Sequence, residues 1–275
     1  MIPYPQIDPT IIKIGPLALR WYGLMYLLGF LASYFLVKLQ IQEDWKRGLV
    51  RDKEQEERLL EGLIVALVAG VILGGRLGYV LFYNLPYFLR HPLEIFATWH
   101  GGMSFHGGAI GVALAGWIYC KRHETDFFLW ADRFAVTAPI GLGLGRIGNF
   151  INGELFGRPT DVPWAMIFPQ GGMVPRHPSQ LYEAFFEGPV LFLILWPLRK
   201  RPWPTGTKLA VFFMAYGLIR FFLEFFREPD PQLGFIAFGW LTMGQALSIL
   251  LIVLGAIIYL VRRNACKEGG EDVTC

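Results

Sequence analysis

The sequence predicts an all-α polytopic membrane protein, for three reasons. Of its 275 residues, 54% are hydrophobic and only 17% are charged, whereas about a quarter of the residues in a soluble domain are charged. The mean hydropathy is +0.41. Seven segments also reach the roughly 20 mostly apolar residues that a helix needs to cross a bilayer.

The seven predicted transmembrane helices follow one another along the chain. In order they are Leu19–Val37, Leu60–Tyr83, Gly102–Cys120, Leu129–Phe150, Leu181–Leu198, Lys208–Phe226 and Trp240–Val261. Because no soluble domain stands between them, residues 1–275 are expected to form a single integral membrane domain. The stretch MIPYPQIDP has no basic cluster, so the first segment is expected to remain as a spanning helix rather than serve as a cleaved signal peptide.

Lys and Arg mark one side of the membrane. They are dense after the first, third, fifth and seventh segments and sparse in the other connections. The dense connections carry Lys38, Lys46, Arg47, Arg51, Lys53 and Arg58; Lys121 and Arg122; Arg199, Lys200, Arg201 and Lys208; and Arg262, Arg263 and Lys267. The positive-inside rule therefore predicts an outer N-terminus and a cytoplasmic C-terminus.

One connection on the outer side differs from the rest. Residues 151–180 form a long segment that is rich in proline. This composition predicts a small head outside the membrane.

The stretch GLGLGRIGNFINGELFGR, residues 141–158, places charged and amide groups at membrane depth. Arg146, Asn149 and Glu154 lie there among several glycines, and an unpaired charge in that environment costs several kcal/mol, on the order of 2.5 or more. The glycines argue against an unbroken helix, and irregular backbone is tolerated in a membrane where it lines a cavity. Tight helix packing around an internal ion pair is one interpretation; a pocket for a lipid or substrate headgroup is the one favoured.

A second polar stripe lies in AYGLIRFFLEFFREPD. Tyr216, Arg220, Glu224 and Arg227 recur at helical spacing and share one face. They fit an internal Glu–Arg ladder. Together with Arg146, however, Arg220 also supplies a second guanidinium for bidentate phosphate binding.

Single polar residues in other segments have two interpretations each. Arg76, among glycines, fits either a structural ion pair or a ligand contact. His106, in GGMSFHGGAIG, fits either a hydrogen-bonded structural residue or a group that a substrate approaches across glycines. Tyr22 is by default an interfacial aromatic, and Glu183, in PRHPSQLYE, begins the fifth segment.

Several function classes are excluded by missing motifs. The chain has no HExxH, GxSxG or P-loop pattern, and its histidines and cysteines lack metal-ligand spacing. No metal, no other cofactor and no nucleic-acid partner are therefore expected.

Seven stretches resemble one family, the bacterial prolipoprotein diacylglyceryl transferases. They run in order as RWYGLMYLLGF, GGRLGYVLFYN, GGMSFHGGAIG, GLGLGRIGNFINGELFGR, PRHPSQLYE, YGLIRFFLEFFREPD and MGQALSI. The part GRIGNFINGELFG is similar to the family's signature. The resemblance implies a seven-helix enzyme of the bacterial inner membrane with a periplasmic head and an active site toward the periplasm.

The resemblance also implies the reaction. Such enzymes transfer the diacylglyceryl group of phosphatidylglycerol to the thiol of the lipobox cysteine of a preprolipoprotein, with glycerol phosphate as the other product. This is the first step of lipoprotein maturation. The implied partners are phosphatidylglycerol, lipobox peptides and membrane lipid. The resemblance implies that the following residues are functionally important: Tyr22, His106, Arg146, Asn149, Glu154, Gly157, Tyr216, Arg220 and Glu224, and also Glu183.

Roles follow as hypotheses. Arg146 and Arg220 hold the phosphate, with Asn149 and Glu154 fixing the guanidinium groups, while Arg76 is a further candidate contact to the lipid. Histidine has an ordinary pKa of about 6.5, which makes His106 the candidate base for the substrate thiol; Tyr22 or a water are the alternatives. Two rival functions are an anion transporter, which lacks support from paired half-repeats, and an assembly scaffold.

Overall fold

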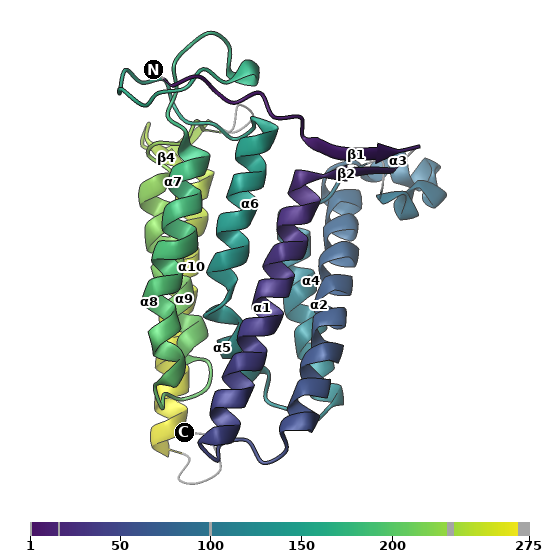
Figure 1. Ribbon diagram of the computed structural model, residues 1–275, viewed down its shortest axis with the longest axis vertical. Coiled ribbons are helices and arrows are strands. Elements are labelled where there is room, and N and C mark those ends of the chain that lie inside the picture. The colour runs from purple at the N-terminus through teal and green to yellow at the C-terminus, as the bar shows by residue number, and fades with distance from the viewer. Residues whose placement is uncertain (1, 16, 99–100, 230–233, 269–275) are drawn as a thin grey trace. The chain divides into compact units, whose positions relative to one another are not determined.

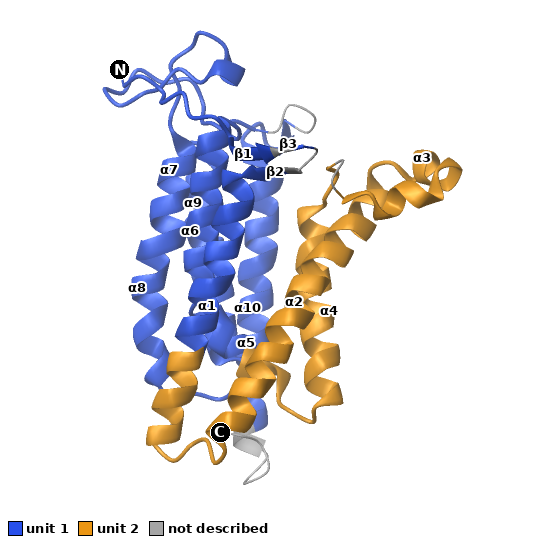
Figure 2. Ribbon diagram, turned by 45° about the vertical axis from the view of Figure 1, so that its right-hand side comes forward, with its two compact units in different colours: residues 1–37, 131–275 blue, residues 38–130 orange. Residues whose placement is uncertain are grey.

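Helices dominate the computed structural model, which describes residues 2–15, 17–98, 101–229 and 234–268 (Figure 1). The chain divides into two compact units, coloured separately in Figure 2. Unit 1 comprises Met1–Val37 and Ala131–Cys275, and unit 2 comprises Lys38–Trp130. The chain passes between them within helices α1 (Trp21–Lys46) and α5 (Phe127–Ala135). The expectation of a single integral domain stays a prediction.

Unit 2 is built on two long helices, α2 (Lys53–Phe82) and α4 (Phe105–Arg122), joined through α3 (Leu85–Arg90) and the 3₁₀ turn η1 (Pro92–Phe96). The two long helices meet along glycines. A Cβ added to Gly70, Gly74 or Gly78 would run into the backbone or side chains of α4 and the residues just before it. Small residues therefore set how closely α2 and α4 approach, as they do in membrane helix pairs.

Unit 1 holds the remaining elements. Its helices are α6 (Ala138–Asn152), α7 (Ser179–Phe185), the π-helical segment η4 (Phe186–Val190), α8 (Leu191–Leu195), the 3₁₀ turn η5 (Trp196–Lys200), α9 (Thr207–Leu223) and α10 (Met243–Glu268). Its strands form two antiparallel pairs, β1 (Thr10–Ile14) with β2 (Leu17–Arg20) and β3 (Phe235–Ala237) with β4 (Leu241–Thr242). The core includes Val136, Leu191 and Leu195, packed against side chains of α9.

Most of each predicted segment lies in helix, although the first begins in β2 and the seventh includes β4, and two segments are interrupted. The fourth is bent by 50° between α5 and α6, and the fifth passes through η4. Among the described residues, four helices are long and apolar enough to cross a membrane, or five if the bent pair is one span. Helix α9 has 17 residues, short of the usual length of about 20, so seven spans stay a prediction.

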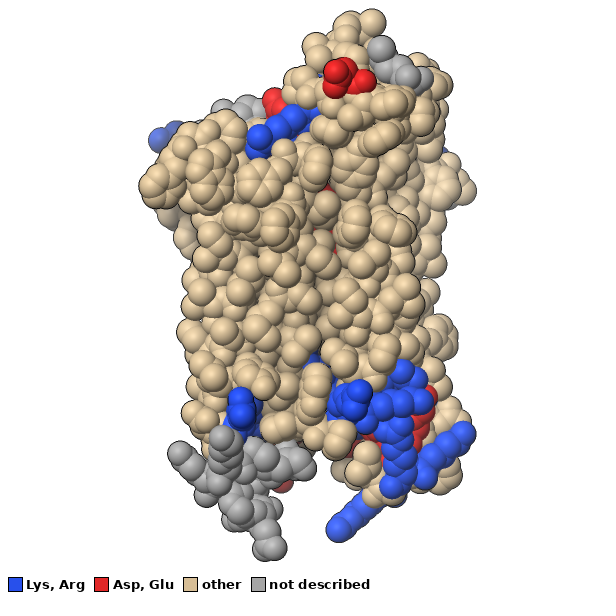
Figure 3. All heavy atoms as spheres, turned by 90° about the vertical axis from the view of Figure 1, so that its left-hand side faces the viewer, with Lys and Arg blue, Asp and Glu red and all other residues tan. Residues whose placement is uncertain are grey.

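The surface fits a helical membrane protein. On the face that Figure 3 shows, uncharged side chains cover a broad middle band, and Lys and Arg gather toward the lower end of the view. Such a band is what hydrocarbon requires of the side chains that face it.

The predicted head is a loop region, residues 153–178, at the end of α6 in Figure 1. It includes the short 3₁₀ turn η3 (Pro169–Gly171), and its backbone is bridged between Pro159 and Arg176. The N-terminal residues fasten to it, since the Ile2 amide donates to Ala165 O at 3.1 Å.

Tyr4 fastens the same N-terminal segment to α6. Its hydroxyl donates to Phe150 O at 2.6 Å and is 3.1 Å from Ile151 O, which satisfies carbonyls that a helix end leaves without partners. Burial raises the pKa of Tyr4. The end of α6 is thus tied down before the chain enters the head.

Candidate active site

Helix α6 continues past Arg146 without a break and ends inside the Gly-rich stretch, at Gly153. The expected interruption therefore lies at Gly153 and not at Gly145 or Gly148, because these two glycines stay helical. A Cβ on Gly148 would lie 2.8 Å from the Tyr22 ring of α1, and one on Gly143 would lie 2.9 Å from Gly188 of η4. Close packing on two sides offsets the low helix propensity of glycine. The helix ends at Gly153, whose φ of +68° suits the left-handed cap.

Arg146 and Arg220 meet at one carboxylate. The Arg146 Nη1 atom is 3.0 Å from Glu183 Oε2, and the Arg220 Nη1 atom donates to Glu183 Oε1 at 2.7 Å. Glu187 accepts from Arg146 Nε at 3.0 Å. The structure therefore brings together two guanidinium groups that are far apart in the sequence.

The ion network continues past the end of α9. Glu224 pairs with Arg220, four residues earlier, and the Arg227 Nη1 atom is 3.9 Å from Glu183 Oε1. Glu183 and Glu187 are fully buried, at 0% exposure. Buried charges cost several kcal/mol each unless paired, up to about 20 in the idealised limit, and here three arginines face three glutamates.

The local fold of residues 179–190 places Glu183 and Glu187. They are four residues apart and share a helix face. The helix then becomes π-helical at η4, where Gly188 has non-helical angles and Pro189 lacks an N–H. Segments of this kind are rare and often occur at functional sites. Gly188 lets η4 approach Gly143, so the carboxylates reach Arg146.

Sequence reasoning missed Glu187. The signal was present in YEAFFEG, residues 182–188, where two glutamates stand one helical turn apart in an apolar segment. A pair of buried carboxylates requires cations, and Arg146 and Arg220 were already recognised as needing partners.

Glu154 supports amide groups rather than Arg146. It accepts from Asn149 Nδ2 at 2.9 Å and from Asn152 Nδ2 at 3.0 Å. Gln180 Nε2 donates to its backbone carbonyl at 2.7 Å. The expectation that Asn149 and Glu154 hold the arginine side chains is therefore corrected, because Arg146 forms its ion pairs with Glu183 and Glu187.

Gly157 lies where three backbone segments meet. Its amide donates to His177 O at 2.9 Å, and the next amide, of Arg158, donates to Phe226 O at 2.9 Å. A Cβ at Gly157 would lie 2.6 Å from both of those carbonyl oxygens. The glycine thus joins the head to the chain that follows Glu224, which accounts physically for its place in the signature.

Tyr22 and Tyr216 belong to the same unit as the arginines. Tyr22 packs on Gly148, and its hydroxyl is 3.2 Å from that of Tyr26. Tyr216 stacks on Phe212 and lies one turn before Arg220 on α9.

Arg76, in unit 2, is bound to backbone carbonyls instead of a carboxylate. Its Nε, Nη1 and Nη2 atoms donate to five carbonyl oxygens between Glu94 and Gly102, at 2.5 to 3.2 Å. Its guanidinium also lies over the Phe88 ring. Since a guanidinium has five N–H donors, none is left for a lipid phosphate. These contacts favour a structural role for Arg76, and its contact with the lipid stays a prediction.

His106, also in unit 2, is exposed in the first turn of α4, with its ring edge-on to Phe105. Ser104 caps this helix by accepting from the Gly107 amide. That His106 acts at the same site as Arg146 stays a prediction.

His177 and Tyr182 form a polar cluster beside the head. The Tyr182 hydroxyl accepts from Trp164 Nε1 at 2.6 Å and is 3.2 Å from His177 Nδ1. Burial lowers the pKa of His177, so it favours the neutral ring that can accept a hydrogen bond from Tyr182.

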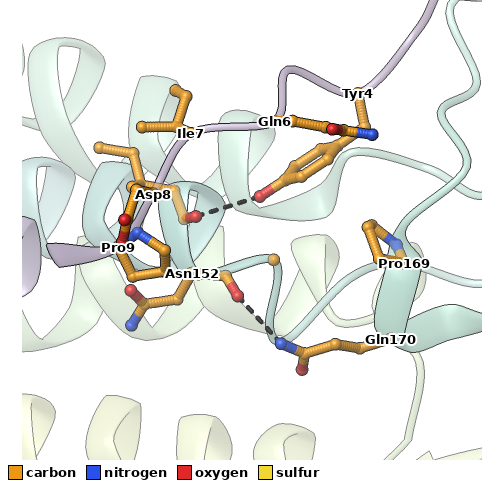
Figure 4. A pocket seen from close by; sticks show the side chains of 10 residues that line it. Tyr4, Gln6, Ile7, Asp8, Pro9, Asn152, Pro169 and Gln170 are labelled. Carbon is orange, nitrogen blue, oxygen red and sulfur yellow. Dashed lines mark hydrogen bonds between the residues drawn. The ribbon is translucent and has the colours of Figure 1, made fainter.

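A surface hollow of ≈ 330 Å³ lies between the N-terminal segment and the end of α6. Figure 4 shows Tyr4, Asp8, Asn152 and Gln170 around it, with Gln170 donating to Asn152 O. The ion network does not line this hollow. Within the described ranges, no group of three His, Cys, Asp or Glu side chains is placed to hold a metal ion.

Comparisons with known proteins identify the family of the chain. The family described as prolipoprotein diacylglyceryl transferase matches residues 9–261. Three relatives carry the name phosphatidylglycerol–prolipoprotein diacylglyceryl transferase. That of Desulfotalea psychrophila is 55% identical over 96% of both chains. That of Geobacter sulfurreducens is 56% identical over 92% of this chain and 94% of its own, and that of Pseudomonas aeruginosa is 49% identical over 97% and 98%. The chain belongs to the prolipoprotein diacylglyceryl transferase family.

Proposed function

We propose that the protein transfers the diacylglyceryl group of phosphatidylglycerol to the lipobox cysteine of preprolipoproteins, the first step of their maturation. The near full-length match to relatives named for this transfer carries the proposal. In the reaction, a C–S bond forms between the thiol and the glyceryl carbon while the C–O bond to phosphate breaks. The products are a thioether and glycerol phosphate, and the thiol proton passes to a base.

Arg146 and Arg220 bind the phosphate in this proposal. Glu183 and Glu187 hold the two guanidinium groups in fixed orientations, which lowers the entropic cost of binding. The Arg146 side chain keeps 17% of its surface exposed, so a headgroup can reach it. The phosphate takes the place of carboxylate oxygens as the acceptor of some of the guanidinium N–H groups. The guanidinium charge then stabilises the negative charge that develops as glycerol phosphate leaves as a dianion.

The proposal also assigns the base, the membrane topology and the position of the acyl chains. His106 takes the thiol proton, with Tyr22 or a water as the alternatives. The chain crosses the inner membrane seven times, with the N-terminus and the 151–180 head in the periplasm, and the active site opens toward that side. The acyl chains lie in the bilayer while the headgroup is held.

The decisive experiment is direct. Purified protein is mixed with phosphatidylglycerol liposomes and a lipobox peptide, and the peptide mass is followed. A gain of one diacylglyceryl group supports the proposal, and a peptide with serine in place of the cysteine should stay unmodified. Anion flux without a covalent product would instead support a transporter, and neither flux nor product would support a scaffold.

His106→Gln tests the base. If His106 accepts the thiol proton, removing the ring nitrogen that takes it should lower the transfer rate by about 10²–10⁴-fold, the usual contribution of a general base. Initial rates of lipobox peptide modification measure the effect, and a variant with the wild-type rate would remove His106 from the role.

A further inference from the structure

The stretch MGQALSI matched the family without a role, and the structure places it at the N-terminus of α10. Thr242 precedes the helix, and its hydroxyl accepts from the Gln245 amide at 3.2 Å. In return, Gln245 Oε1 accepts from the Thr242 amide at 3.0 Å. This reciprocal pair is a capping box. Because Gln245 is 0% exposed and Thr242 is 2% exposed, the pair lies inside the protein rather than on its surface.

The Thr242 hydroxyl has a second partner. It donates to Glu224 Oε1 at 3.0 Å, the same glutamate that pairs with Arg220. One hydroxyl thus links the start of α10 to the end of α9. A carboxylate near a helix N-terminus is also favoured by the helix dipole.

Gly244 makes room for that carboxylate. A Cβ at this position would lie 2.5 to 2.8 Å from the three carboxyl atoms of Glu224. A second glycine lets α9 and α10 come close further along the pair, where Gly217 of α9 contacts the Ser248 carbonyl and Ile252 of α10. The packing of α9 on α10 therefore brings the capped end onto Glu224.

We infer that Thr242 and Gly244 are positioning residues for Arg220, acting through Glu224. The hydroxyl fixes the Glu224 carboxylate, which in turn fixes the guanidinium that also binds Glu183. This inference rests on the proposed function, because it concerns the arginine that binds phosphate there. A loosely held guanidinium binds a phosphate less well, since its orientation must be restricted on binding.

Thr242→Val removes the hydroxyl while keeping the shape of the side chain. We expect the KM for phosphatidylglycerol to rise at least tenfold, with a smaller change in kcat. Thr242→Ser, which retains the hydroxyl, should stay within about threefold of wild type, a change of ~0.7 kcal/mol. Thr137→Val is the matched control, because Thr137 is also buried before a helix and its hydroxyl donates to a backbone carbonyl, Phe134 O, rather than to a carboxylate. It should leave the KM unchanged.

Glu224→Gln separates positioning from simple capping. If Thr242 acts through Glu224, Thr242→Val should weaken phosphatidylglycerol binding much less in the Glu224→Gln background than in wild type. Binding to phosphatidylglycerol nanodiscs supplies the readout even for inactive variants. If Thr242→Val does not fold, Gly244→Ala replaces it, since it keeps the cap but crowds the carboxylate; the same loss of binding is expected.

Two results would overturn the inference while leaving the proposed function intact. One is a Thr242→Val enzyme, or its Gly244→Ala replacement, with the wild-type KM and binding. The other is an equal loss in the Glu224→Gln background, which would show that the hydroxyl acts only as a cap. A wild-type protein that forms no lipidated peptide would instead reject the proposed function.

Discussion

Lysine in place of Arg146 should lower the transfer rate by about 100-fold or more, the usual effect of losing one donor to a transition-state anion. The positive charge remains, but a lysine ammonium cannot reproduce the planar fork that binds Glu183 and Glu187 through separate nitrogens. Arg220→Lys should have an effect of similar size, because that guanidinium is bound to the same carboxylate. Initial rates of lipobox peptide modification measure both.

Arg58→Lys is the control for this pair. Arg58 is an exposed residue whose contact with Glu54, at 3.8 Å, is a surface ion pair, and such pairs contribute little. The Arg58→Lys variant should transfer at the wild-type rate and should be present in the membrane in the same amount as wild type. Full activity in Arg146→Ala or Arg220→Ala would contradict the two-arginine phosphate site.

Gly157→Ala should abolish most of the activity and lower the free energy of unfolding by about 1–3 kcal/mol, the range typical of overpacking. The added methyl group would meet His177 and Phe226 carbonyl oxygens at 2.6 Å, and these atoms belong to backbone that cannot turn aside as a side chain can. Gly157 also forms an antiparallel backbone bridge with Arg227; this bridge would open, and the chain after Glu224 would move. Thermal unfolding and transfer rates measure the two effects.

Gly145→Ala is the matched control within the same stretch. Apart from its chain neighbours and the nearby backbone of its own helix, no described residue lies within 4 Å of a Cβ built there. An alanine inside a helix is also about 0.5–1 kcal/mol more favourable than a glycine. The variant should therefore be active and at least as stable as wild type. Equal behaviour of Gly145→Ala and Gly157→Ala would show that the close approach at Gly157 has no role.

The apolar segments were predictable because their signal is local. A membrane helix needs a long run of apolar side chains, and each of the seven runs is mostly helical in the structure. Arg146, Arg220 and Glu224 were also recognisable from the sequence, because charges in such runs require a reason. The i, i+4 spacing of Arg220 and Glu224 predicted their contact, and the structure confirms it.

Other features depended on approaches between helices. The glycines of α6 suggested a helix broken near Arg146. They remain helical there because other helices pack closely on them, as Gly188 does on Gly143, and these partners come from distant parts of the chain. Arg76 gave no sign that carbonyls rather than a carboxylate would surround it.

The sequence by itself determined the helical segments, the family and the two arginines, because hydropathy, spacing and motifs are properties of neighbouring residues. Only the tertiary structure decided that Glu183 and Glu187 hold those arginines, that Glu154 supports Asn149, and that Thr242 reaches Glu224. The contacts of Glu183, Glu187 and Thr242 form where small residues let two helices come close. That distance depends on the packing of both helices and cannot be read from either one alone.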